Sequence, residues 1–239
     1  MDRRSNNIAI FQDSMDLIKA SQKLQQAVQF SIQNQKLYVP SQAIALPEPG
    51  KSPCKTIVSS KRSFEAASAY AKSGKRVCVL NFASATNPGG GVTRGSTAQE
   101  ECLCRCSTLY PCLDTETMWH QFYQQHRKTG DPLYNDDLLY TPGVVIFKTD
   151  TSVPERMEEK DWYQVDIITC AAPNLRKKPS NAMNPSAGNA PVKISEKALY
   201  ELQMQKTGTC FSGGSIERSG SSDFRRVWSV ALSVTRREL

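Results

Sequence analysis

Apolar side chains recur at intervals of three or four residues between positions 13 and 33, which predicts an amphipathic helix. The apolar stripe consists of Met15, Leu17, Ile18, Leu24, Val28 and Ile32. Asp13 or Ser14 could cap this helix, because short polar side chains accept hydrogen bonds from the free N–H groups of a first turn. Residues 35–62 contain four prolines and little periodicity, so we expect irregular structure there.

Short apolar runs alternate with segments of helical character along the rest of the chain. The runs that predict buried strands are 77–83 (VCVLNFA), 143–148 (GVVIFK) and 165–171 (VDIITCA). The segments that predict helices are 63–73, one that starts at Ser96 or Thr97, 115–127 and 194–204, whereas 174–192 predicts an exposed loop. Strands that alternate with helices indicate an α/β fold with a mostly parallel sheet.

Composition narrows the class of protein. The chain has 239 residues, of which 39% are hydrophobic and 22% charged, so we expect one domain, or at most two, with a sizeable core. No apolar run approaches the roughly 18 residues of a membrane helix, and the N-terminus lacks the apolar stretch of a signal peptide. We therefore expect an intracellular protein whose eight cysteines are thiols. With only two histidines, a His-rich metal site is not favoured.

The formal net charge of +7 suits an anionic partner such as nucleic acid or a phosphorylated ligand. The basic residues are spread over the chain instead of forming one run, and they are not interleaved with aromatic residues. A solvated basic surface is therefore favoured over a nucleic-acid groove.

The most informative segment follows the predicted strand 77–83 and reads NPGGGVTRGSTAQEE from Asn87 to Glu101. A strand, a glycine loop and a helix start present backbone N–H groups to an anion. The segment lacks the lysine of a P-loop and the G-x-G-x-x-G pattern of a dinucleotide fold, so neither is predicted. Both possible helix starts carry a capping box, Ser96 with Gln99 and Thr97 with Glu100.

Two consecutive acids, Glu100 and Glu101, lie in the first turn of this predicted helix. Acids at that position stabilise the helix dipole, which is a purely structural explanation. Adjacent helical residues point about 100° apart, so the two carboxylates do not form the opposed pair of an ordinary glycosidase. They suit separate tasks, one in acid–base chemistry and one in binding a sugar hydroxyl.

Three glycines, a seven-residue spacer and QEE together resemble the signature of the poly(ADP-ribose) glycohydrolases. The text that follows, CLCRCSTLY (102–110), resembles the microbial-type branch of that family. The resemblance extends more loosely over residues 8–203. It implies a macrodomain-like three-layer α/β fold with a central mixed sheet flanked by helices, and hydrolysis of ribose–ribose bonds in poly(ADP-ribose) without a metal or another cofactor.

The resemblance also implies roles for individual residues. Glu101 would be the catalytic acid/base, and Glu100 would hold ribose hydroxyls. Asn87 would orient that ribose, Gly89, Gly90 and Gly91 would cradle the phosphates, and Gln99 would support the site from the helix start. The implied partners are poly(ADP-ribose) or ADP-ribosylated proteins, with ADP-ribose as the product and no membrane; we expect a monomer.

One hypothesis concerns the proton that Glu101 would have to donate. A helix N-terminus favours an ionised carboxylate, whereas proton donation needs the acid. We expect the substrate diphosphate and the neighbouring Glu100 to favour the protonated form of Glu101.

The chain departs from the family after residue 203. Family members continue into another buried strand and a second glycine loop of the G-x-F-G-x-G-x-F kind, which this chain does not show. We expect a catalytic domain at 8–203 that lacks its last strand and second phosphate loop, and a divergent, disordered tail at 204–239. A shifted reading frame, a decayed C-terminus or a lineage-specific tail would each explain it. The alternative function is therefore a weak or inactive ADP-ribose-binding module.

Other polar and aromatic residues have simpler explanations. Cys102, Cys104 and Cys106 are expected to be buried thiols, and His120 and His126 to be surface residues. The loop at 170–174 follows a predicted strand end and could line an adenosine pocket. Tyr70 and Tyr110 could stack on adenine, although packing in the core is the default.

Overall fold

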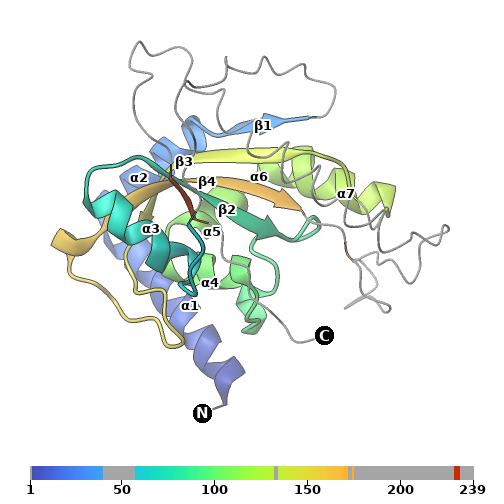
Figure 1. The fold of residues 1–239 in the computed structure, drawn as a ribbon. Coiled ribbons are helices and arrows are strands. Elements are labelled where there is room, and N and C mark those ends of the chain that lie inside the picture. Colours follow the sequence, from blue (N-terminus) through green and yellow to red (C-terminus); the bar gives the residue numbers. More distant parts are fainter. Residues whose placement is uncertain (1, 40–56, 132–133, 172–173, 175–228, 232–239) are drawn as a thin grey trace, which may run out of the picture.

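The computed structural model describes residues 2–39, 57–131, 134–171 and 174 and the backbone of 229–231 (Figure 1). These residues form a five-stranded sheet with the strand order β1-β3-β4-β2-β5. The strands are β1 (Lys36–Tyr38), β2 (Val77–Ala83), β3 (Leu138–Ile146), β4 (Tyr163–Ala171) and β5 (Ser229–Ala231). β2 pairs in parallel with both β4 and β5, whereas β3 is antiparallel to β1 and β4.

The sheet is therefore mixed, as the family resemblance implies, and the expectation of a mostly parallel sheet is wrong. β3 and β4 are consecutive in the chain and joined by residues 147–162, which contain one 3₁₀ turn (Glu159–Asp161) and no crossover helix. Without a helix that crosses the sheet, the chain returns beside β3 in the opposite direction. Two of the three predicted strands, 77–83 and 165–171, are observed and lie side by side, and the third, 143–148, is the end of the longer strand β3.

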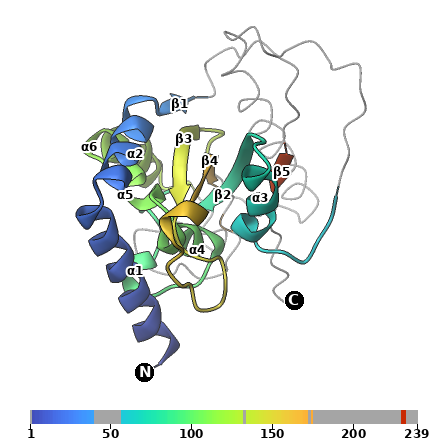
Figure 2. The same cartoon turned by 90° about the vertical axis from the view of Figure 1, so that its left-hand side faces the viewer.

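Seven α-helices are found in the described residues. They are α1 (Arg3–Ala20), α2 (Gln22–Gln33), α3 (Ser63–Lys72), α4 (Gln99–Cys106), α5 (Leu109–Leu113), α6 (Glu116–Met118) and α7 (Gln124–Thr129), with a π-helical turn at Trp119–Tyr123. Figure 1 shows α1, α3, α4 and α5 beneath the sheet, and Figure 2 shows α2 towards the β3 side and α3 towards the β2–β5 side. None of these helices combines the length and the apolar character needed to cross a bilayer.

The main core lies between the sheet and these helices. Alternate residues of β2, Val77 and Val79, point into it together with Val165 and Ile167 of β4. The intervening residues of β2, Cys78 and Leu80, belong to a second cluster on the opposite face. This alternation follows from the two-residue period of a strand, and it explains why continuous apolar runs in the sequence correspond to strands that are buried on both faces.

The predicted helix at 13–33 is two helices, and the predicted caps Asp13 and Ser14 are wrong. α1 begins at Arg3, where the carboxylate of Asp2 accepts a hydrogen bond from the Ser5 N–H. Ser21 adopts extended backbone angles between α1 and α2, and its hydroxyl accepts from the Leu24 N–H. A serine therefore ends one helix and caps the next inside a single apolar pattern.

Some of the predicted segments lie partly or wholly outside the described residues. The irregular segment predicted at 35–62 contains the short strand β1, and its residues 40–56 lie outside the description. The predicted loop at 174–192 (residue 174 aside) and the predicted helix at 194–204 also lie outside it. In the divergent tail, three residues of the apolar stretch 227–234 form β5, which extends the sheet beside β2.

A buried lysine fastens α1 to the segment that follows β3. Lys148, 1% exposed, donates to the Ile10 carbonyl and to the Ser14 hydroxyl, and its ammonium lies 2.7 Å from a carboxylate oxygen of Asp13. Burial lowers the pKa of Lys148, while the contact with Asp13 raises it and so offsets part of that shift. The charge is tolerated because all its donors face oxygen atoms.

We predict that Lys148→Ala lowers the free energy of unfolding by about 3 kcal/mol, because it removes a buried charge that holds two elements together. Lys23→Ala is the matched control: Lys23 pairs with Glu159 at the surface, where both side chains are more than half exposed, and should change stability by less than about 0.5 kcal/mol. Urea unfolding measures both values. Equal effects would contradict the role assigned to Lys148.

Candidate functional site

The candidate site lies where β2 ends and the chain turns into α4. The Gly90 N–H donates to the Asn87 carbonyl, and the Val92 N–H donates to the Gly89 carbonyl. Gly89 and Gly90 both have a φ of +60°, a backbone conformation that glycine adopts without a steric cost. A short 3₁₀ turn (Val92–Arg94) then leads to α4.

Glu101 turns back over the glycines. The Gly91 N–H donates to its Oε1 atom at 2.8 Å. Its other oxygen, Oε2, is buried without a hydrogen-bond partner in the structure. A methyl group at Gly90 would lie 2.6 Å from Glu101 Oε1 and 3.1 Å from Glu100 Oε2. The glycine turn and the carboxylate therefore touch, and one carboxylate oxygen has no hydrogen-bond partner among the described residues.

Glu100 points in another direction, as the helical geometry of adjacent residues requires. Its Oε2 atom accepts from the Ser84 N–H at 2.7 Å, and its Oε1 atom lies 3.4 Å from the amide nitrogen of Asn81. Burial raises the pKa of Glu100 to about 8, and the neighbouring charge of Glu101 adds to this rise, although the two hydrogen bonds oppose it. Glu100 therefore carries a proton at neutral pH.

Gln99 connects α4 to the strand and to α3. Its Oε1 atom accepts from the Phe82 N–H at 2.8 Å, and its Nε2 atom donates to the Leu80 carbonyl at 2.7 Å and to the Ser63 hydroxyl at 3.1 Å. The amide is thereby used in full by contacts within the protein. Gln99 therefore fixes the start of α4, which carries the two glutamates, to β2 and α3.

Asn87 is held by a residue that the sequence did not single out. Arg127, from α7, donates to the Asn87 Oδ1 atom at 2.6 Å and to the Thr86 carbonyl at 2.7 Å. The guanidinium also lies 4.7 Å from the ring centroid of Trp119. The contact crosses the π-helical turn at Trp119–Tyr123, which the sequence did not predict, so local pattern held no signal for the arginine.

The predicted capping boxes at the start of α4 are wrong. Ala98 occupies the N-cap position and makes no side-chain hydrogen bond. Ser96 instead donates its N–H to the Gly91 carbonyl, and its hydroxyl lies where a side chain of Gly91 would have to be. The serine closes the glycine turn, so its side chain is not available for the helix.

The remaining candidates divide between the core and the surface. Cys104 and Cys106 are buried thiols as expected, whereas Cys102 is only half-buried. His120 is exposed, but the expectation of a surface position for His126 is wrong: its ring is 2% exposed and lies between the Phe122 carbonyl and the Asn135 side chain. Tyr110 packs beside Gly89 and against Phe11. Among the described residues, no three His, Cys, Asp or Glu side chains form a group that could hold a metal.

The chain is similar to one protein family and to several solved structures. The profile of the family described as microbial-type PARG, catalytic domain, matches residues 10–149. The solved structure of poly(ADP-ribose) glycohydrolase (PARG) from Thermomonospora curvata superposes with a TM-score of 0.72 at 25% identity, over 90% of this chain and 77% of that one. The enzyme from Deinococcus radiodurans in complex with ADP-ribose gives 0.59 at 28% identity, over 78% and 70%. No curated protein matches the chain.

The fold is thus the macrodomain-like α/β fold of poly(ADP-ribose) glycohydrolases. The chain belongs to the microbial-type PARG catalytic-domain family, and the matched residues include the glycine turn and both glutamates. Another structure of the Thermomonospora curvata enzyme, bound to the inhibitor ADP-HPD, superposes with a TM-score of 0.66 at 25% identity, over 90% of this chain and 76% of that one.

We predict that Gly90→Ala lowers the free energy of unfolding by about 3 kcal/mol, because it combines an unfavourable φ with a clash against Glu101. Gly130→Ala is the matched control, since Gly130 has a φ of +62° and nothing within 4 Å of its added methyl group. That variant should lose only about 1 kcal/mol. Equal losses of unfolding free energy for the two variants in denaturant would show that Gly90 and the Glu101 carboxylate are not in close contact.

The raised pKa of Glu100 predicts a pH-dependent stability. Between pH 4.5 and about 8 the folded protein keeps a proton that the unfolded chain has lost, so this residue destabilises the fold increasingly as the pH rises through that window. Glu100→Gln removes the effect. The stability of the variant relative to the wild type should therefore increase from pH 5 to pH 8, by at most about 1.4 kcal/mol per pH unit.

Urea unfolding at pH 5, 6.5 and 8 measures this difference. Glu158→Gln is the control, because the side chain of Glu158 is 74% exposed and its partner, Lys160, does not titrate in this window, so the difference should be independent of pH. A constant difference for Glu100→Gln would contradict the protonation state given above.

Proposed function

We propose that this chain hydrolyses the ribose–ribose O-glycosidic bonds of poly(ADP-ribose) and releases ADP-ribose, with Glu101 as the acid/base. The observation that carries the proposal is the environment of Glu101: one oxygen is fixed by the Gly91 N–H, and the other is buried with no partner. A carboxylate fixed at one oxygen presents the other in a defined direction. Membership of the PARG family supplies the class of bond.

The chemistry divides into two proton transfers. Glu101 donates a proton to the leaving ribose oxygen as the bond to the anomeric carbon breaks, and the anomeric carbon takes on oxocarbenium character. The resulting carboxylate then accepts a proton from a water molecule whose oxygen forms the new bond to that carbon. A single carboxylate performs both steps, which fits a site where the second acid points elsewhere.

Glu100 has a different task in this mechanism. Its pKa of about 8 leaves it neutral at physiological pH, so its hydroxyl can donate to a ribose oxygen while its carbonyl oxygen accepts. A neutral Glu100 adds no negative charge beside Glu101. The sequence-based hypothesis about the proton on Glu101 stays a prediction.

The other residues named from the sequence are proposed to assist the two glutamates. Gly89, Gly90 and Gly91 form the turn against which a diphosphate would lie, close to the start of α4. Asn87 is oriented by Arg127, and Gln99 fixes the helix start to β2. Partners proposed on this basis are poly(ADP-ribose) or ADP-ribosylated proteins, bound by a monomeric, intracellular catalytic domain at residues 8–203 that needs no cofactor.

A second candidate is an ADP-ribose-binding module that turns over slowly or not at all. It is favoured by the text after residue 203, where the second glycine loop of the family is absent from the sequence. Calorimetric binding of ADP-ribose together with no release from polymer would support this candidate over the hydrolase.

We predict that Glu101→Gln lowers the rate of ADP-ribose release from poly(ADP-ribose) at least 100-fold, because Gln keeps the shape but cannot donate or accept the proton. Glu116→Gln, at an exposed carboxylate, should retain full activity. Chromatography of the released ADP-ribose measures both. A Glu101→Gln protein as active as the wild type would overturn the assignment of the acid/base.

A further inference from the structure

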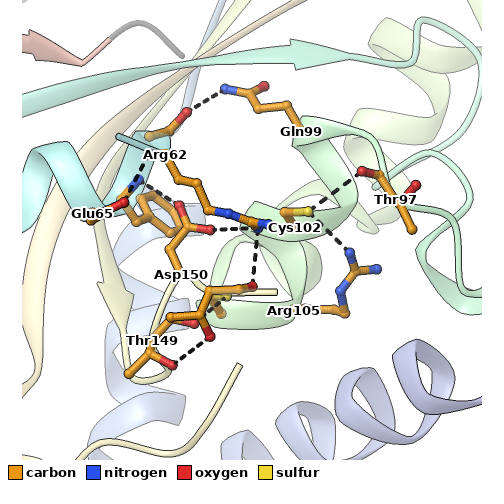
Figure 3. A network of polar contacts seen from close by, with 12 residues as sticks. Arg62, Glu65, Thr97, Gln99, Cys102, Arg105, Thr149 and Asp150 are labelled. Carbon is orange, nitrogen blue, oxygen red and sulfur yellow. Dashed lines mark hydrogen bonds and ion pairs between the residues drawn. The ribbon is translucent and has the colours of Figure 1, made fainter. Parts of the chain in front are cut away.

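Two arginines lie near the glycine turn, and they differ in their access to a ligand. Arg105, on α4, is 2% exposed, and Figure 3 shows its guanidinium directed at the sulfur of Cys102, so it is shielded from a ligand. Arg127, on α7, is half-buried and donates to Thr86 and Asn87, just before the glycines. Of the two, Arg127 is therefore the arginine that can influence a bound substrate.

The contact with Arg127 fixes the orientation of the Asn87 side-chain amide. An arginine donates hydrogen bonds and accepts none, so the Asn87 atom that it reaches at 2.6 Å is the carbonyl oxygen, Oδ1. The amide nitrogen donates to the Thr86 hydroxyl at 3.0 Å. An amide nitrogen carries two hydrogens, and the second one makes no hydrogen bond to any residue that the structure describes. One N–H donor of Asn87 is therefore left for a ligand, while its oxygen is engaged by the cation.

The backbone of Asn87 is fixed as well. Its N–H donates to the Ser84 hydroxyl at 3.2 Å, and its carbonyl accepts from the Gly90 N–H at 3.0 Å. The residue is half-buried, so a ligand can approach it. An amide that is held at the backbone, at its oxygen and at one hydrogen presents the other hydrogen in a defined direction.

Arg127 is in turn held by an aromatic frame. Its guanidinium carbon lies 4.7 Å from the ring centroid of Trp119. The Trp119 indole N–H donates to the carboxylate of Asp114 at 2.8 Å, and the other oxygen of that carboxylate accepts from the Tyr110 hydroxyl at 2.9 Å. The frame fixes the plane of the guanidinium, so that its donors meet Asn87 and the preceding carbonyl together.

We propose that Arg127 is a positioning residue for substrate recognition, which turns the Asn87 amide so that one N–H donor meets the terminal ribose of ADP-ribose. The group of the ribose that receives this N–H is a hydrogen-bond acceptor, a hydroxyl or ring oxygen. Arg127 acts through Asn87 and does not itself contact the diphosphate. ADP-ribose is the ligand of the proposed function, on which this role rests.

A direct contact between Arg127 and the diphosphate is the competing explanation. The Nη1 atom of Arg127 makes no hydrogen bond to the described residues, so it has donors that a phosphate could use. The two roles differ in what they require. A positioning residue has an effect only when both Asn87 and the ribose are present, whereas a phosphate contact strengthens the binding of any diphosphate.

The first experiment is a double-mutant cycle in which calorimetry measures the dissociation constant of ADP-ribose. Asn87→Ala should raise this constant about tenfold and Arg127→Met about fivefold, as expected for the loss of one hydrogen bond each. The double variant should also be about tenfold weaker than the wild type, because the arginine then has nothing to orient. Independent contacts would multiply to about fiftyfold. A loss above about thirtyfold would overturn the proposal.

The second experiment compares ADP-ribose with ADP, which has the diphosphate but lacks the terminal ribose. Arg127→Met should lower the preference for ADP-ribose over ADP about fivefold, because only the ribose contact is lost. A merely structural role would not change this preference. Lys128→Met is the matched control: Lys128 is exposed on the same helix, and the variant removes the same charge but should leave the preference unchanged. Equal losses for the two ligands in Arg127→Met would overturn the proposal.

Two further arms keep the outcome decisive. Arg127→Lys replaces Arg127→Met if that variant does not fold, since a lysine cannot donate to two oxygens in the planar geometry of a guanidinium; the same criteria apply to it. A wild-type protein that binds ADP-ribose but releases none from polymer would contradict the proposed function, while the binding data would still decide on Arg127. A wild-type protein that binds no ADP-ribose would overturn both.

Discussion

The contact between Gly91 and Glu101 is the constraint on which the rest of the site depends. The backbone N–H of the turn reaches the carboxylate at 2.8 Å only because the neighbouring residue, Gly90, has no side chain. A methyl group there would meet both Glu101 and Glu100. The glycines therefore have a role within the protein and not only towards a ligand. They let the backbone approach Glu101, which is buried and hydrogen-bonded at one oxygen.

Side-chain hydrogen bonds from several elements hold this contact in place. Gln99 ties the start of α4 to the end of β2, and Arg127 ties Asn87 and the preceding carbonyl to α7. On the other side, Asn7 of α1 donates to the Gly95 carbonyl. Each of these polar side chains makes hydrogen bonds to backbone or amide atoms. The turn is therefore positioned by hydrogen bonds of fixed direction and not by packing alone.

The sequence predicted the parts of the fold that depend on local pattern. The strand at 77–83 and helix α3 are observed where the sequence pattern predicts them. The glycines and the two glutamates of QEE, which the sequence singled out together, are in contact in the structure. The sequence could not predict the direction of β3, because pairing is decided by the connection through residues 147–162 and not by the strand itself. Local pattern also missed the break at Ser21 and the role of Ser96, where a serine serves a distant or competing contact.

The environment of individual side chains was harder still to predict. His126 and Arg127 are neighbours in one basic helix end, yet one is buried between two acceptors and the other reaches the site. Arg105 is likewise only 2% exposed in the fold, although a charged side chain on a helix is usually solvated. Such outcomes depend on which elements meet in space, which a single sequence does not state.

A crystal structure of the Glu101→Gln protein with ADP-ribose tests the central claim most directly. We predict that the diphosphate lies against residues 89–91 and that the side-chain nitrogen or oxygen at position 101 that is not bound to Gly91 faces the anomeric carbon of the terminal ribose. A ligand bound away from the glycine turn, or an anomeric carbon facing a different side chain, would contradict it.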